Sequence, residues 1–89
     1  MTIKRIAAAG TLESSDALVT LEPSEDLTIT IESVVKEIFG DQIEACVKGT
    51  LQRLGVTGAK VHVQDKGAFD CTISARVETA VLRAMKEAV

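Results

Sequence analysis

The sequence predicts a single α+β domain over residues 1–89, with a small antiparallel or mixed sheet and two main helices packed on one face. Two observations lead to this prediction. Apolar residues occupy every second position over several short segments, as in half-buried strands, and recur at three- and four-residue spacing over two longer ones, as in amphipathic helices. With two Phe, no Tyr and no Trp, the core is expected to be aliphatic.

Two strands are expected in the first third of the chain. Residues 17–22 and residues 27–32 each place apolar side chains at every second position. The segment between them contains Pro23, whose ring fixes φ, and polar neighbours that favour local hydrogen bonds. We therefore expect two strands separated by a turn.

A helix is expected after the second strand. Gly40 interrupts the apolar pattern, and Asp41 with Glu44 could form a capping pair, so one kinked helix or a short turn followed by a 41–54 helix would fit. Gly55 favours a helix end, because glycine adopts the left-handed conformation at low cost. The apolar positions of this segment are Val35, Phe39, Ile43, Cys46, Val47, Leu51 and Leu54.

The last third predicts a hairpin followed by a second helix. Apolar and polar residues alternate over residues 60–64, and apolar residues again occupy every second position at Phe69, Cys71 and Ile73. Between the two segments, Asp65-Lys66-Gly67 is typical of a tight hairpin loop. The tail has helical spacing, and Ser74 is expected to cap it. The apolar positions of the tail are Val77, Val81, Leu82, Met85 and Ala88.

The charge and hydropathy patterns disfavour nucleic acid and membrane as partners. The net charge is −3, whereas nucleic-acid binding needs a clustered basic face. No run approaches the roughly 20 apolar residues of a membrane span, and the apolar start of the chain is too short for a signal peptide. We expect a soluble, cytoplasmic protein with reduced cysteines.

Few residues could support catalysis. His62 is the only histidine and is expected to point outward from a strand. Cys46 on the apolar helix face and Cys71 on the apolar side of a strand are expected to be buried and inert. No nucleophile–base pair, metal-ligand spacing or glycine-rich phosphate loop is visible. We therefore expect no catalytic site and no metal site.

The cluster Glu13-Ser14-Ser15-Asp16 has two interpretations. It could be a turn whose hydroxyls and carboxylates bond to nearby backbone N–H groups. Alternatively, one serine could be an attachment point for another enzyme to modify. That role needs an exposed hydroxyl on a mobile segment and no general base.

The stretch from Ala9 to Asp16, Ala-Gly-Thr-Leu-Glu-Ser-Ser-Asp, resembles the N-terminal signature of citrate lyase acyl carrier proteins. Essentially all 89 residues are similar to that family's pattern. The further segments that carry the resemblance are Phe39-Gly40, Leu54-Gly55-Val56, Asp65-Lys66-Gly67-Ala68, Asp70-Cys71 and Ala75-Arg76-Val77.

The resemblance implies a non-catalytic carrier subunit. It places a covalent 2′-(5″-phosphoribosyl)-3′-dephospho-CoA arm on Ser14, with Ser15 chemically equivalent from sequence alone. It implies acetyl and citryl thioesters on that arm, and as partners the citrate lyase α and β subunits and a prosthetic-group transferase. Residues 1–16, which bear the attachment serine, are expected to be mobile. The alternatives are the acyl carrier subunit of malonate decarboxylase and a cofactor-free interaction domain.

Overall fold

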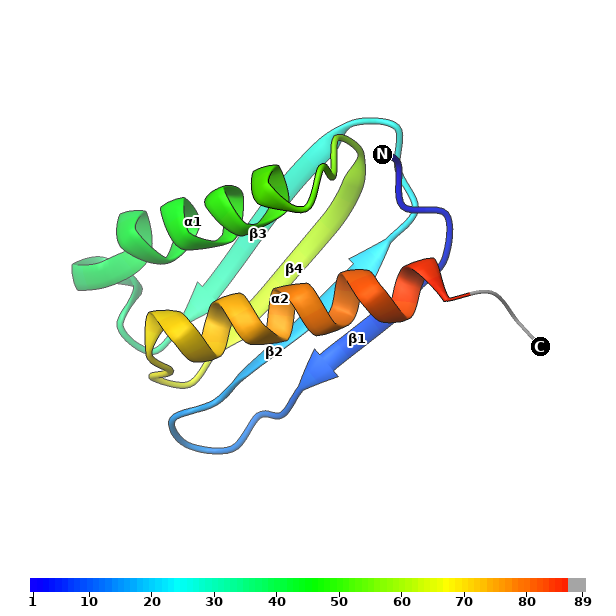
Figure 1. The fold of residues 1–89 in the computed structure, drawn as a ribbon. Coiled ribbons are helices and arrows are strands. Elements are labelled where there is room, and N and C mark those ends of the chain that lie inside the picture. Colours follow the sequence, from blue (N-terminus) through cyan, green and yellow to red (C-terminus); the bar gives the residue numbers. More distant parts are fainter. Residues whose placement is uncertain (87–89) are drawn as a thin grey trace.

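The computed structural model describes residues 1–86 and has four strands and two helices within that range (Figure 1). The strands are β1 (Ala7–Gly10), β2 (Ala17–Glu22), β3 (Leu27–Ser33) and β4 (Ala59–Asp65). The helices are α1 (Lys36–Arg53), between β3 and β4, and α2 (Asp70–Met85), after β4.

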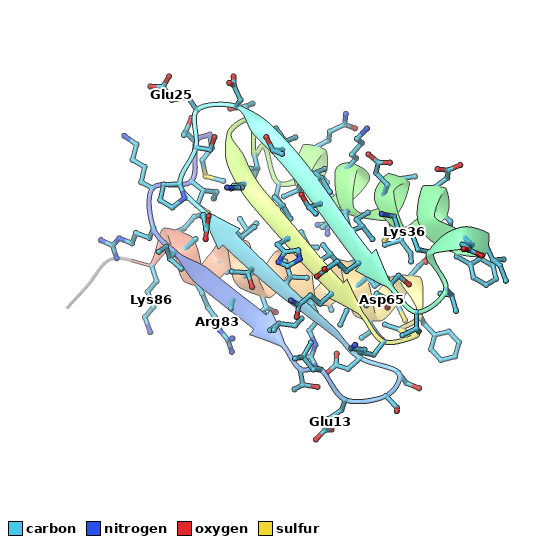
Figure 2. The ribbon with its side chains drawn as sticks, turned by 180° about the vertical axis from the view of Figure 1, so that it is seen from behind. Glu13, Glu25, Lys36, Asp65, Arg83 and Lys86 are labelled. Atoms are coloured by element: carbon cyan, nitrogen blue, oxygen red, sulfur yellow. The ribbon has the colours of Figure 1, made fainter. Side chains whose placement is uncertain are left out.

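The four strands form one mixed sheet in the order β1-β2-β4-β3. β2 pairs antiparallel with both β1 and β4, whereas β3 pairs parallel with β4. A parallel pair needs a crossover connection, and α1 provides it. Both helices cover the same face of the sheet, and Figure 2 shows the opposite face without a helix. The predicted α+β architecture is confirmed, and the sheet is mixed.

The core lies between the sheet and the helices and is aliphatic, as predicted. The inward side chains of β2 and β4 alternate with side chains on the open face, which gives each strand a strict period of two. Among residues 1–86, the buried apolar set contains no aromatic side chain, and both phenylalanines are exposed. The largest fully buried apolar side chains are Val19, Leu21, Val47, Leu51, Val61, Val63, Ile73, Val77 and Val81.

The hairpin predicted around residues 65–67 is wrong, because β4 is followed by α2 and not by another strand. The buried carboxylate of Asp65 accepts hydrogen bonds from Ser33 Oγ (2.7 Å) and from the Ala68 backbone N–H (2.9 Å). These bonds turn the chain out of the sheet and into the helix. Three alternating apolar residues in 69–73 were too few to distinguish a strand from the start of a helix.

The predicted cap of the second helix is wrong, and the structure decides between the two alternatives for the first. Ser74 lies inside α2, where its Oγ is 3.0 Å from Thr50 Oγ1 of α1, and Phe69 is the N-cap residue. α1 runs without interruption through Gly40, so the 41–54 alternative and its Asp41 capping pair do not describe the start of this helix. The predicted end is confirmed, because Gly55 follows the C-cap residue with φ +76°.

The N-terminal segment contains a strand that the alternation pattern did not reveal. β1 is only four residues long and has the sequence Ala-Ala-Ala-Gly, which carries no period-two signal. Ile3 is buried in the core, and its backbone N–H donates to Gly58 O at 2.7 Å. Residues 1–10 are thus fastened at several points, and the mobility expected for residues 1–16 stays a prediction. Within the described chain, neither helix has the length and apolar character to cross a membrane.

Candidate functional site

Ser14 and Ser15 lie at the tip of the β1–β2 hairpin, in a tight turn. The Asp16 backbone N–H donates to Glu13 O at 3.1 Å, which closes a four-residue turn. Ser15 has φ +66°, the left-handed value that a type II turn requires at its third position. Ser14 therefore occupies the outer corner of the turn, and Figure 2 shows neighbouring Glu13 projecting away from the body of the domain.

The base of this turn is fixed by Asp16. Arg76 of α2 donates Nε–H to Asp16 Oδ1 and Nη2–H to Oδ2, both at 2.9 Å, in a two-point ion pair. The same carboxylate accepts from Thr11 Oγ1 and from the Ala17 backbone N–H, each at 2.7 Å. The Arg76 guanidinium, followed by these two donors, holds the pKa of Asp16 well below its usual range.

A second set of contacts joins the turn to the loop after β4. The Ser15 backbone N–H donates to Lys66 O at 2.8 Å, and the Lys66 backbone N–H donates to Asp16 O at 2.9 Å. These bonds extend the β2–β4 ladder by one step beyond Ala17. The turn over residues 13–16 is therefore held at its base, while its two serines remain exposed.

The Asp16–Arg76 pair predicts a specific pH dependence of stability. Because the folded pKa of Asp16 is depressed, its stabilisation is fully present above the unfolded value near 3.8 and is lost as pH falls toward the folded pKa. We expect Asp16→Asn to be less stable than wild type in urea unfolding at pH 7, with the difference shrinking as pH falls below about 4. The matched control Glu13→Gln removes a carboxylate from the same turn. The difference between its stability and that of wild type should not shrink as pH falls. A constant gap between Asp16→Asn and wild type from pH 7 to pH 2 would contradict the prediction.

Ser14 is suited to modification but not to nucleophilic catalysis. Within residues 1–86 its hydroxyl is exposed and makes no hydrogen bond with the protein, so no base is placed to accept its proton. His62 lies on the open face of the sheet, with its Nε2 2.7 Å from Glu32 Oε2, as the outward prediction required. The described residues contain no cluster of side chains that could hold a metal ion.

The two cysteines are not part of the Ser14 turn. Cys46 was expected to be buried and is half-buried on α1, where burial, followed by the nearby charge of Asp70, raises the pKa of its thiol. Cys71 was expected to be buried on a strand, but it is exposed in the first turn of α2. That error follows directly from the misplaced hairpin.

Sequence reasoning did not find the residues that fix the turn. Arg76 is 60 positions from Asp16, and nothing in a single sequence pairs a helical arginine with an acid at the other end of the chain. Asp65 was interpreted as a loop residue, although it is 1% exposed. A buried acid at the end of a strand gives no periodic signal.

Comparisons with known proteins match this chain over nearly its whole length. The family model described as the acyl carrier protein "Malonate decarboxylase delta subunit (MdcD)" matches residues 4–84. A citrate lyase acyl carrier protein of Haemophilus influenzae (strain PittEE) is 52% identical over 89 residues, 100% of this chain and 94% of that protein. The chain belongs to the citrate lyase acyl carrier protein family.

Two further relatives carry the same family name, and one solved structure shares the fold. The citrate lyase acyl carrier protein of Streptococcus mutans is 52% identical over 86 residues, 94% of this carrier chain and 84% of that protein. That of Treponema denticola is 51% identical over 84 residues, 94% of this chain and 97% of that protein. A chain in the crystal structure of a Pseudomonas malonate decarboxylase hetero-tetramer in complex with malonate has a TM-score of 0.82. At 19% identity, covering 94% of this chain and 88% of that chain, the similarity shows the fold alone.

Proposed function

We propose that this acyl carrier subunit of citrate lyase bears a covalent 2′-(5″-phosphoribosyl)-3′-dephospho-CoA group on Ser14, through a phosphodiester to the serine oxygen. The observation that carries the proposal is the placement of Ser14 at the exposed corner of a turn whose base is anchored by Arg76. A hydroxyl in this position is accessible to a transferase, and its attachment would leave the core untouched. When bound, the group supplies a terminal thiol that holds acetyl and citryl groups as thioesters.

The residues of this chain then have a positioning role only. The Asp16–Arg76 pair and the Lys66 backbone fix where the base of the turn lies on the domain. The tether keeps the acyl group at a high effective concentration near partner sites. We infer that the partners are the citrate lyase α and β subunits and the prosthetic-group transferase, that catalysis belongs to those partners, and that the complex is cytoplasmic.

The second candidate is the acyl carrier subunit of malonate decarboxylase, favoured by the description of the matching family model. The relatives that are 51–52% identical are named for citrate lyase, whereas the malonate decarboxylase chain shares 19% of its residues with this one. Citrate lyase is therefore the better supported assignment.

Intact mass spectrometry tests the proposal directly. The chain is co-expressed with the enzymes that synthesise and transfer the prosthetic group, and its mass is compared with that of the chain expressed alone. We expect an increment equal to the phosphoribosyl-dephospho-CoA group, located by peptide mapping on Ser14. An unmodified chain in the presence of a transferase that loads a known carrier would contradict the proposed function.

A further inference from the structure

An apolar groove opens next to the attachment turn, between the starts of the two helices. One wall is formed by Val35, the N-cap residue of α1, together with Phe39 and Gln42 of that helix. The other wall is formed by residues 67–70. Its volume is about 510 Å³, within the range of small-molecule sites. Figure 1 shows both helices beginning at the end of the domain that carries the β1–β2 turn.

Phe39 and Phe69, the two phenylalanines of a sequence without Tyr or Trp, both line this groove. Phe69 is 77% exposed and Phe39 is 46% exposed, although large aromatic residues normally stabilise a fold by being buried. Neither contributes to the core of the described residues. Exposed aromatic side chains lining one concave surface indicate a binding site.

The groove also offers polar atoms between its apolar walls. Gln42 Nε2 donates to Asp70 Oδ2 at 3.1 Å, which links α1 to α2 across the groove and leaves the Gln42 amide oxygen free to accept another hydrogen bond. An occupant that combines methyl and methylene groups with amides would match this lining.

The attachment serine lies close to the groove. Ser15 N–H bonds to Lys66 O, and the next residue, Gly67, lines the groove. Through this contact, standard bond lengths place the Cα atoms of Ser14 and Gly67 at most about 10 Å apart. The pantetheine portion of a CoA-type arm has the length of about four residues, or about 14 Å extended, and lies beyond the nucleotide portion. The arm can therefore reach back into the groove.

We propose that the groove between the starts of α1 and α2 holds the pantetheine portion of the arm attached to Ser14 when the carrier is free of its partners. This inference rests on the proposed function. The apolar walls contact the dimethyl and methylene groups, and Gln42 accepts a hydrogen bond from an arm amide. The thiol is thereby shielded from solvent between its visits to partner sites.

Two measurements on the loaded carrier test this proposal. Amide chemical shifts of the loaded and unloaded chains are compared, and the rate of alkylation of the arm thiol by iodoacetamide is followed by mass. Both cysteines of the chain are first replaced by serine. We expect loading to shift the signals of residues 39–42 and 67–70 in addition to those of the turn. If the sheltered state is about 90% populated, Ala68→Trp, which fills the groove, should raise the alkylation rate about tenfold.

Controls separate this proposal from the alternatives. Phe69→Ser gives a second groove variant at an exposed site, in case tryptophan disturbs folding, and should also raise the rate. Leu82→Ala changes an exposed apolar residue near the other end of α2 and should leave the rate unchanged. Shifts confined to residues 13–16 with equal rates in all variants would overturn the groove assignment alone. The groove assignment would also be overturned if the groove variants weakened binding of the α or β subunit without changing the alkylation rate of the arm thiol. A chain that acquires no arm would overturn the proposed function and the groove assignment together.

Discussion

Ser14→Ala is expected to abolish arm attachment completely while leaving the fold intact. The Ser14 hydroxyl is exposed and has no hydrogen-bond partner within residues 1–86, so its removal costs little free energy of unfolding, within about 0.5 kcal/mol. The turn itself depends on the Asp16–Glu13 backbone bond and on the Asp16 carboxylate, neither of which involves the Ser14 side chain. Intact mass after co-expression with the transferase measures the modification, and urea unfolding measures the stability.

Ser15→Ala is the matched control, because it removes the same group one position away. The hydrogen bond from the backbone N–H of Ser15 to Lys66 O does not involve the side chain, so it remains in that variant and arm attachment should be retained. Alanine tolerates φ +66° less readily than glycine does, so Ser15→Gly is a second version of the control that keeps the turn unstrained. Full loading of Ser14→Ala together with loss of loading in both Ser15 variants would move the site to Ser15.

The strands and helices that the sequence predicted well are those whose apolar period continues for six residues or more. β2 and β4 alternate over their whole length, β3 does so around Ile29 and Ile31, and α1 packs on the core through Ile43, Val47 and Leu51. Where these apolar positions contact the core, a single sequence records the pattern directly. The same reasoning located the end of α1, since Gly55 adopts the left-handed conformation there.

The errors occur where tertiary contacts decide between two local structures. The first apolar residues of α2 fit a short strand as well as a helix, and the buried hydrogen bonds of Asp65 to β3 decide between them. β1 is a strand because Ala9 packs in the core and pairs with Val19, although polyalanine favours helix. Neither contact can be inferred from neighbouring residues. The candidate serine was found from a resemblance, whereas its anchor on Arg76 was found only in the structure.

Gly10→Ala is expected to destabilise the domain strongly, by at least about 3 kcal/mol. Gly10 ends β1 with φ +100°, and a Cβ atom placed there would lie 1.8 Å from Ala17 O and 3.2 Å from Arg76 Cδ. Both neighbours belong to the base of the turn over residues 13–16, so neither can move without breaking the β1–β2 pairing or the Asp16–Arg76 pair. Urea unfolding at neutral pH measures the loss of stability.

Gly55→Ala isolates the contribution of the clash from that of backbone strain. Gly55 also has a positive φ, +76°, but an added Cβ would meet nothing within 4 Å. It should cost only the strain of a left-handed alanine, about 1–2 kcal/mol. Equal destabilisation of the two variants would contradict the close approach at Gly10.

Because the clash displaces the base of the turn, Gly10→Ala should also lower the rate of arm transfer to Ser14 under conditions where the variant is folded, whereas Gly55→Ala should not. Gly10 would then be required for the geometry of the turn in which the transferase binds Ser14.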